Sequence, residues 1–186
     1  MKSKLPENAK LTFKGEIWEV YQWPQKMFDG TTATFEGLKH RKNGVKIIAI
    51  HQGKIIMTKE KRPGEQKTYY TMPGGGIEEN ELPLDAAKRE LLEETGVRSD
   101  TWEELYAFDV LNYPRIDFYT YLYVARNCTK VSEPKLDGGE EIAIEEVDFD
   151  TFVKNLYSNK ERFGMAFSQI IENTEKINAL KNKLEL

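Results

Sequence analysis

The sequence has few of the features expected of a secreted, membrane-spanning or polymer-binding protein. Its one cysteine, Cys128, cannot form an internal disulfide. It contains no run of about 18 apolar residues, and the opening segment MKSKLPENAK is too polar for a secretory signal. We therefore expect a cytoplasmic protein with no membrane contact. The formal net charge of −4 creates no positive field, which disfavours a nucleic-acid polymer as a partner.

The composition fits one folded domain. Of the 186 residues, 39% are hydrophobic, which is enough to bury a core. No repeat or low-complexity linker divides the chain, so we expect a single domain over residues 1–186. Within it, the aromatic segment 1–35 is expected to add an N-terminal strand extension, and residues 158–186 a C-terminal helix. The two histidines, His40 and His51, are isolated, and a structural role is favoured for both.

Strand and helix signals alternate along the chain and predict an α/β protein with a large mixed sheet. Runs of β-branched and aromatic residues between turn-rich segments predict strands near residues 45–50, 54–58, 68–72, 102–111, 115–125 and 142–147. The segment from Pro83 to Thr95 is typical of a helix, since proline suits the first turn, Asp85 complements the dipole and Gly96 can end the element.

Three carboxylates of this helix form the most informative pattern. Glu90, Glu93 and Glu94 stand at i, i+3 and i+4, so their side chains leave nearly the same face and repel one another. Hard carboxylate oxygens bind divalent cations well, and Mg²⁺ or Mn²⁺ would relieve the repulsion. The alternative is a solvated acidic helix. A glycine-rich turn at residues 73–76 precedes the helix and allows backbone conformations denied to other residues.

The segment GGIEENELPLDAAKRELLEETGV, from Gly75 to Val97, resembles the signature of the Nudix hydrolases at every fixed position. This match disfavours the solvated-helix alternative. The resemblance implies the Nudix α/β/α sandwich with a mixed β-sheet. In that family the box at residues 75–97 holds Mg²⁺ or Mn²⁺ against a nucleoside diphosphate linked to another group.

The resemblance also implies roles for individual residues of the box. Those roles are metal ligands at Glu90 and Glu94, a further ligand or water-orienting catalytic group at Glu93, a backbone carbonyl ligand at Gly74 or Gly75, and a supporting pair in Glu81 and Arg89. Glu94 is also taken as catalytic. For Arg89, the helical spacing allows pairing with Glu93 or with the preceding Glu81.

Residues outside the box give weaker indications of the substrate. The acidic loop with Glu140 and Glu141 resembles one that supplies a base in ADP-ribose pyrophosphatase-like members, although a solvated turn is the alternative. Arg62 could bind the phosphates, or belong to an exposed turn. Trp23 and Phe28 could stack a base, since this region crosses between subunits in such relatives, although core packing is the alternative. A homodimer is therefore possible.

The leading hypothesis is metal-dependent hydrolysis of the pyrophosphate bond in ADP-ribose or a nucleotide sugar, which are small-molecule substrates. One alternative is a MutT-like enzyme that releases pyrophosphate from nucleoside triphosphates. Another is a non-catalytic Nudix module that senses a nucleotide. The complete glutamate set disfavours the sensor, because a sensor does not need the full metal array.

Overall fold

The computed structural model describes residues 3–61, 63–136, 138, 141–159 and 170–186. The strands are β1 (Lys10–Lys14), β2 (Trp18–Lys26), β3 (Thr32–His40), β4 (Gly44–His51), β5 (Lys54–Lys61), β6 (Tyr69–Thr71), β7 (Val97–Arg98), β8 (Thr101–Asp109), β9 (Ile116–Asp117), β10 (Tyr119–Arg126), β11 (Thr129–Lys130) and β12 (Glu141–Val147). The helices are α1 (Pro83–Thr95), α2 (Phe149–Ser158) and α4 (Thr174–Leu184). None of the helices in these described ranges is long and apolar enough to cross a membrane.

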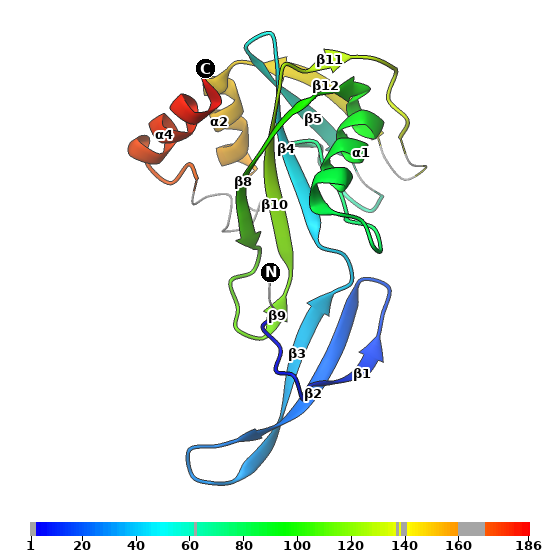
Figure 1. Cartoon of the computed structure of the whole chain (residues 1–186), viewed down its shortest axis with the longest axis vertical. Coiled ribbons are helices and arrows are strands. Elements are labelled where there is room, and N and C mark those ends of the chain that lie inside the picture. Colours follow the sequence, from blue (N-terminus) through cyan, green and yellow to red (C-terminus); the bar gives the residue numbers. More distant parts are fainter. Residues whose placement is uncertain (1–2, 62, 137, 139–140, 160–169) are drawn as a thin grey trace.

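The main body is a mixed sheet between two helical layers (Figure 1). In the described part of the chain, the six-stranded sheet has the order β12-β5-β4-β10-β8, and β6 pairs with β5. Strands β4 and β10 run parallel, while the other neighbours are antiparallel. Helix α1 covers one face, and α2 and α4 cover the other. The expected α/β sandwich with a mixed sheet is confirmed.

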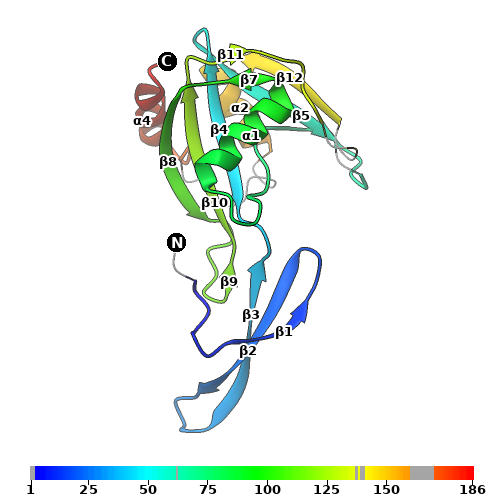
Figure 2. The same ribbon diagram turned by 45° about the vertical axis from the view of Figure 1, so that its right-hand side comes forward.

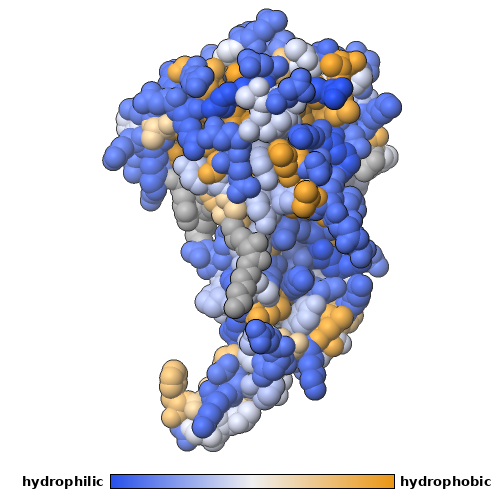
Figure 3. Space-filling view, in the orientation of Figure 1, coloured by the Kyte–Doolittle hydropathy of each residue, from blue (hydrophilic) through white to orange (hydrophobic). Residues whose placement is uncertain are grey.

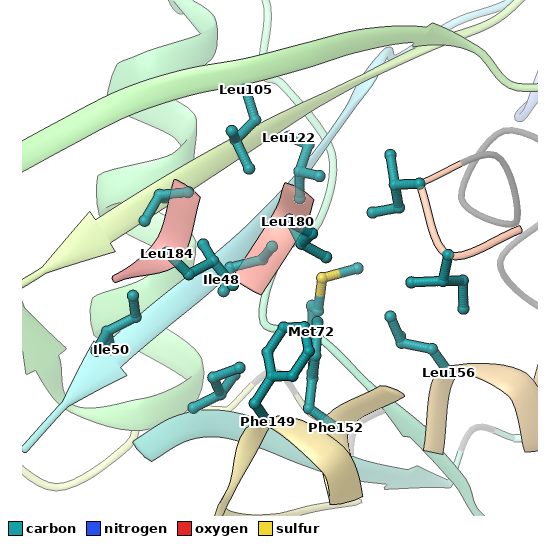
Figure 4. Packing of buried hydrophobic residues seen from close by; sticks show 14 of the residues in the cluster. Ile48, Ile50, Met72, Leu105, Leu122, Phe149, Phe152, Leu156, Leu180 and Leu184 are labelled. Atoms are coloured by element: carbon teal, nitrogen blue, oxygen red, sulfur yellow. The ribbon is translucent and has the colours of Figure 1, made fainter. Parts of the chain in front are cut away.

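Strand β4 separates two apolar clusters because its side chains alternate between the faces. Ile48 and Ile50 pack toward α2 and α4, in the cluster drawn in Figure 4. Val45, Ile47 and Ala49 pack toward α1. A strand covered on both faces reads as a continuous apolar run, which explains the sequence of this segment.

The N-terminal extension is a separate sheet that projects from the body (Figures 1 and 2). Its order is β1-β2-β3-β9, and β3 pairs in parallel with β9 at Leu38 and Ile116. Lys4 ties the chain start to the body, since its Nζ donates to Asp109 at 2.6 Å and its backbone N–H donates to Asp117 at 2.8 Å. Because β3 continues to His40, the extension is longer than the expected residues 1–35.

The expected C-terminal helix over residues 158–186 is wrong in two places. Ser158 is the last residue of α2, and residues 170–173 form a turn and bends. Asn173 explains the restart at Thr174, because its backbone is extended and its Oδ1 accepts from the N–H of Lys176 at 3.0 Å. Residues 160–169 lie outside the described ranges.

Helix α1 has the predicted bounds, Pro83 to Thr95. Its residues Ala86, Ala87 and Leu91 are fully buried against the sheet. Gly96 ends the helix with φ 69°, and its N–H donates to the carbonyl of Leu92. A Cβ at Gly96 would collide with the carbonyl oxygen of Ser132, so glycine is required here for two reasons.

We predict that Gly96→Ala lowers the free energy of unfolding by about 2 to 5 kcal/mol, from left-handed strain plus the collision. Gly53→Ala is the matched control, because Gly53 has φ 76° but no atom within 4 Å of an added Cβ. The control should lose only the strain, about 1 to 2 kcal/mol. Urea unfolding measures both variants, and equal losses would show that the collision is absent.

Candidate active site

The glycine-rich turn at residues 73–76, called the glycine loop below, is fastened to the start of β4. The N–H of Val45 donates to the carbonyl of Gly75, and the N–H of Ile47 to that of Pro73, both at 2.9 Å. Gly74 has φ 139°, and a Cβ there would collide with the carbonyl oxygen of Val45. The loop can therefore approach the sheet this closely only with glycine at position 74.

Glu94 of α1 is buried against the glycine loop. It is 3% exposed, and its Oε2 accepts the N–H of Gly74 at 2.8 Å. Burial raises the pKa of Glu94 to about 8, the charge of Lys46 lowers it, and the charge of Glu60 raises it further. A negative charge on Glu94 is thus unfavourable unless a cation lies nearby.

Glu90 also meets the glycine loop, one helical turn before Glu94. A Cβ at Gly75 would stand 2.5 Å from Oε1 of Glu90, so the bare glycine backbone lets this carboxylate lie directly against the loop. The i, i+4 spacing of Glu90 and Glu94 therefore places two carboxylates on the same stretch of backbone, as the helical pattern predicts.

Arg89 holds the acidic groups together. Its Nε and Nη2 donate to the two carboxylate oxygens of Glu81, both at 2.9 Å. Its Nη1 donates to Glu90 at 2.8 Å and to Glu93 at 3.1 Å, and Nη2 also reaches the carbonyl of Gly76 at 2.9 Å. Hydrogen bonds, first of all to Glu81, raise the pKa of Arg89 above its ordinary value. Both pairings expected for Arg89 are present, together with two more.

A cleft of about 510 Å³ opens beside the glycine loop. The loop forms one wall, and His40 and Phe118 form an aromatic wall, with their rings stacked at 4.2 Å. Lys46 of β4 and Glu60 of β5 also line it. Sequence analysis assigned none of these four side chains to the active site, because the cleft joins segments that lie far apart in the chain.

The other predicted site residues lie elsewhere or outside the described ranges. Trp23 is buried in the extension, where it packs edge-on against Phe35. Phe28 is fully exposed in the turn between β2 and β3. Neither lines the cleft of its own chain. Glu141 is exposed at the start of β12, opposite Lys61, whereas Arg62 and Glu140 lie outside the described residues.

The chemistry of these groups fits a hard divalent cation. Among the residues that the structure describes, no group of three acidic, histidine or cysteine side chains is arranged to hold a metal ion. Arg89 bonds to the carboxylates of Glu90 and Glu93, and the Gly74 N–H bonds to that of Glu94. All the donors are oxygens, which Mg²⁺ and Mn²⁺ prefer. The burial of Glu94 supplies the reason for a cation, since its negative charge has little contact with water.

Comparison with known proteins agrees with this geometry. Residues 40–167 match the family described as NUDIX domain. The chain belongs to the NUDIX family. This match begins at the last residue of β3, so most of the extension lies outside it.

Two relatives of this Nudix chain align over most of their length. An ADP-ribose pyrophosphatase of Bacillus subtilis is 27% identical over 167 residues, which cover 86% of this chain and 89% of the relative. A methanol dehydrogenase activator of Bacillus methanolicus is 29% identical over 178 residues, 92% of each. An RNA pyrophosphohydrolase of Bartonella bacilliformis is 41% identical over only 75 residues, 37% of this chain and 44% of that protein.

A solved structure titled "Crystal structure of ADP compounds hydrolase" shares the fold, with a TM-score of 0.66 at 16% identity. The superposition covers 96% of this chain and 92% of the other. This likeness shows the shared fold. The family match and the Bacillus subtilis relative identify the chain as a Nudix hydrolase, a pyrophosphohydrolase that resembles the ADP-ribose pyrophosphatases. The non-catalytic alternative is therefore set aside.

We predict that Glu94 makes the metal-free protein less stable as the pH rises. Its pKa is about 8 in the folded protein against 4.5 for the free group, so folding binds a proton between these values. The stability that Glu94 contributes is complete below pH 4.5 and is lost as the pH rises through about 8. Glu94→Gln keeps an acceptor for Gly74 without the charge. At pH 8 it should exceed the wild type by a few kcal/mol, because one pKa unit is worth about 1.4 kcal/mol.

Urea unfolding in the presence of a chelator, from pH 5 to 8.5, measures this difference. Glu133→Gln is the control, because the side chain of Glu133 is 85% exposed. Parallel pH curves for Glu94→Gln and the wild type would contradict the assignment.

Proposed function

We propose that the protein hydrolyses the pyrophosphate bond of ADP-ribose or a nucleotide sugar in a Mg²⁺- or Mn²⁺-dependent reaction. The products would be a nucleoside monophosphate and a sugar phosphate. One observation carries the proposal: Glu90 and Glu94 both lie against the glycine loop, and that loop lines a cleft of about 510 Å³. That volume suits a small-molecule substrate, since ligand sites commonly measure about 300 to 1,000 Å³.

Some residues of the box would bind the cation, and others orient those ligands. Glu90, Glu93 and Glu94, with the carbonyl of Gly74, would hold the cation. When bound, the cation neutralises charge on the phosphates and lowers the pKa of a water molecule. Arg89 fixes Glu90 and Glu93 through its hydrogen bonds at 2.8 and 3.1 Å, and Glu81 fixes Arg89 in turn. The hydrogen bonds of Arg89 therefore orient the metal ligands before the substrate binds.

The substrate contacts beyond the box are proposals of the same kind. Glu140 or Glu141 would accept a proton from the attacking water, and Arg62 would bind the phosphates with its planar guanidinium. The stacked rings of His40 and Phe118 offer an apolar wall for the base or the sugar inside the cleft. This wall supports a substrate with a sizeable group attached to the diphosphate.

We also propose a homodimer formed through the N-terminal extension. Leu11, Phe13, Ile17 and Phe28 are exposed there, and Figure 3 shows apolar surface on this lower part of the molecule. Exposed apolar residues in one region favour association. Since Trp23 and Phe28 lie outside the cleft of their own chain, only a second copy could bring Phe28 to a substrate. We propose the cytoplasm as the site of action, where the buried thiol of Cys128 stays reduced.

The dimer predicts that the double variant Phe13→Ser and Ile17→Ser shifts the protein from dimer to monomer. The physical reason is loss of apolar area, worth about 25 cal/mol per Å². Sedimentation velocity measures the mass. Val131→Ser, at an exposed apolar position of the body, is the control and should stay dimeric. A monomeric wild type would overturn the dimer without affecting the proposed chemistry.

The activity predicts AMP and ribose 5-phosphate from ADP-ribose when Mg²⁺ is present. Glu94→Gln should lower kcat roughly 100-fold or more, because it removes a charged ligand. Glu133→Gln should retain wild-type turnover. Product analysis by chromatography on ADP-ribose, sugar nucleotides and nucleoside triphosphates measures this. Pyrophosphate release from triphosphates, without AMP from ADP-ribose, would replace the proposal with the MutT-like alternative.

A further inference from the structure

Lys46 places a positive charge directly beside the glycine loop. Its Nζ donates to the carbonyl of Met72 at 2.8 Å and to that of Gly74 at 3.1 Å. These carbonyls stand on either side of Pro73, so the ammonium group bridges the bend of the loop. The second of them is the carbonyl proposed to hold the metal ion. Lys46 therefore occupies part of the surroundings that a bound cation would need.

Two buried carboxylates lie in the same region. Glu94 is 3% exposed and Glu60 is 2% exposed, and they come from α1 and β5. Lys46 and Glu60 line the same cleft beside Gly74, whose carbonyl accepts from Lys46 at 3.1 Å and whose N–H donates to Glu94 at 2.8 Å. Thr58 Oγ1 donates to Glu60 at 2.9 Å and holds that carboxylate in place. A carboxylate this deeply buried needs a nearby counter-charge whenever it is ionised, because water has little access to it.

We propose that the Lys46 ammonium is a resident counter-ion of the metal site. It stabilises the ionised form of Glu94, beside Glu60, and it opposes the binding of the divalent cation. The inference rests on the proposed metal-dependent function. Its physical basis is that Lys46 and the cation share the carbonyl of Gly74 and the charge of Glu94, and like charges that share ligands repel.

A purely mechanical role for Lys46 makes the opposite prediction. If its hydrogen bonds only kept the glycine loop in shape, their loss would disorder the Gly74 carbonyl and weaken metal binding. If Lys46 is a resident counter-ion, its removal leaves Glu60 and Glu94 without that charge, and the cation binds more tightly. The sign of the change in metal affinity separates the two roles.

The test is Lys46→Met, which keeps an apolar stem and removes the charge. Mn²⁺ binding to the metal-free protein, followed by electron paramagnetic resonance, should tighten about 10-fold, which corresponds to about 1.4 kcal/mol. The melting temperature in chelator should fall, and the stabilisation by Mn²⁺ should grow. Lys46→Gln, which retains a hydrogen-bond donor, is the second variant and should also tighten Mn²⁺ binding.

Two control variants separate the charge at position 46 from the total charge of the protein. Lys46→Arg keeps the positive charge and should bind Mn²⁺ with nearly wild-type affinity. Lys42→Met removes a lysine that also lines the cleft but pairs with Glu78 at 2.8 Å, and it should change the affinity less than about 3-fold. Lys42 thus controls for the overall loss of one positive charge.

The outcomes distinguish this inference from the proposed function. Unchanged or weaker Mn²⁺ binding by folded Lys46→Met and Lys46→Gln, with binding by the wild type intact, would overturn the counter-ion role alone. No Mn²⁺ binding by the wild type would overturn the metal site itself, and the counter-ion role with it. Tighter binding by both variants and near-wild-type binding by Lys46→Arg would establish the role of the charge.

Discussion

The contact between the glycine loop and the glutamates of α1 is the constraint on which the rest of the site depends. The N–H of Gly74 donates to Glu94, and Gly75 leaves no room for a side chain beside Glu90. The loop reaches this position because two backbone hydrogen bonds fasten it to β4. α1 reaches it because its apolar face is buried against the same strand. One strand thus aligns both halves of the site.

Repulsion among the clustered carboxylates is the main energetic cost of this arrangement. The protein offsets it with positively charged side chains, one near the surface and one deeper in the structure. Arg89 binds the more accessible carboxylates, those of Glu81, Glu90 and Glu93, through a planar group suited to several oxygens. Lys46 lies beside the deeply buried Glu94. A divalent cation would join this network of charges and change its balance. Metal affinity is therefore a property of the whole network rather than of the glutamates alone.

The cleft of this Nudix chain combines residues of the family's box with residues from outside the box. The glycine loop of the box lines the cleft, and an aromatic part of its lining comes from His40 and Phe118, near the point where the extension joins the body. Lys4 strengthens that junction through its bonds to Asp109 and Asp117. The aromatic wall is continuous with the extension, because His40 ends β3 and Trp18 of β2 packs edge-on against His40 and Phe118, with ring centroids 4.8 and 5.9 Å apart.

The sequence alone predicted helix α1, the shared face of its three glutamates and the pairing of Arg89 with glutamates near it in the chain. Helix ends and neighbouring side chains on a helix depend on residues only a few positions apart. The C-terminal helix was predicted less well, since the apolar spacing concealed the cap at Asn173. Only the tertiary structure placed Lys46 and Glu60 beside Glu94. The parallel pairing of β4 with β10, which brings together residues far apart in the chain, has no local signal, because the register of strands depends on packing across the whole sheet.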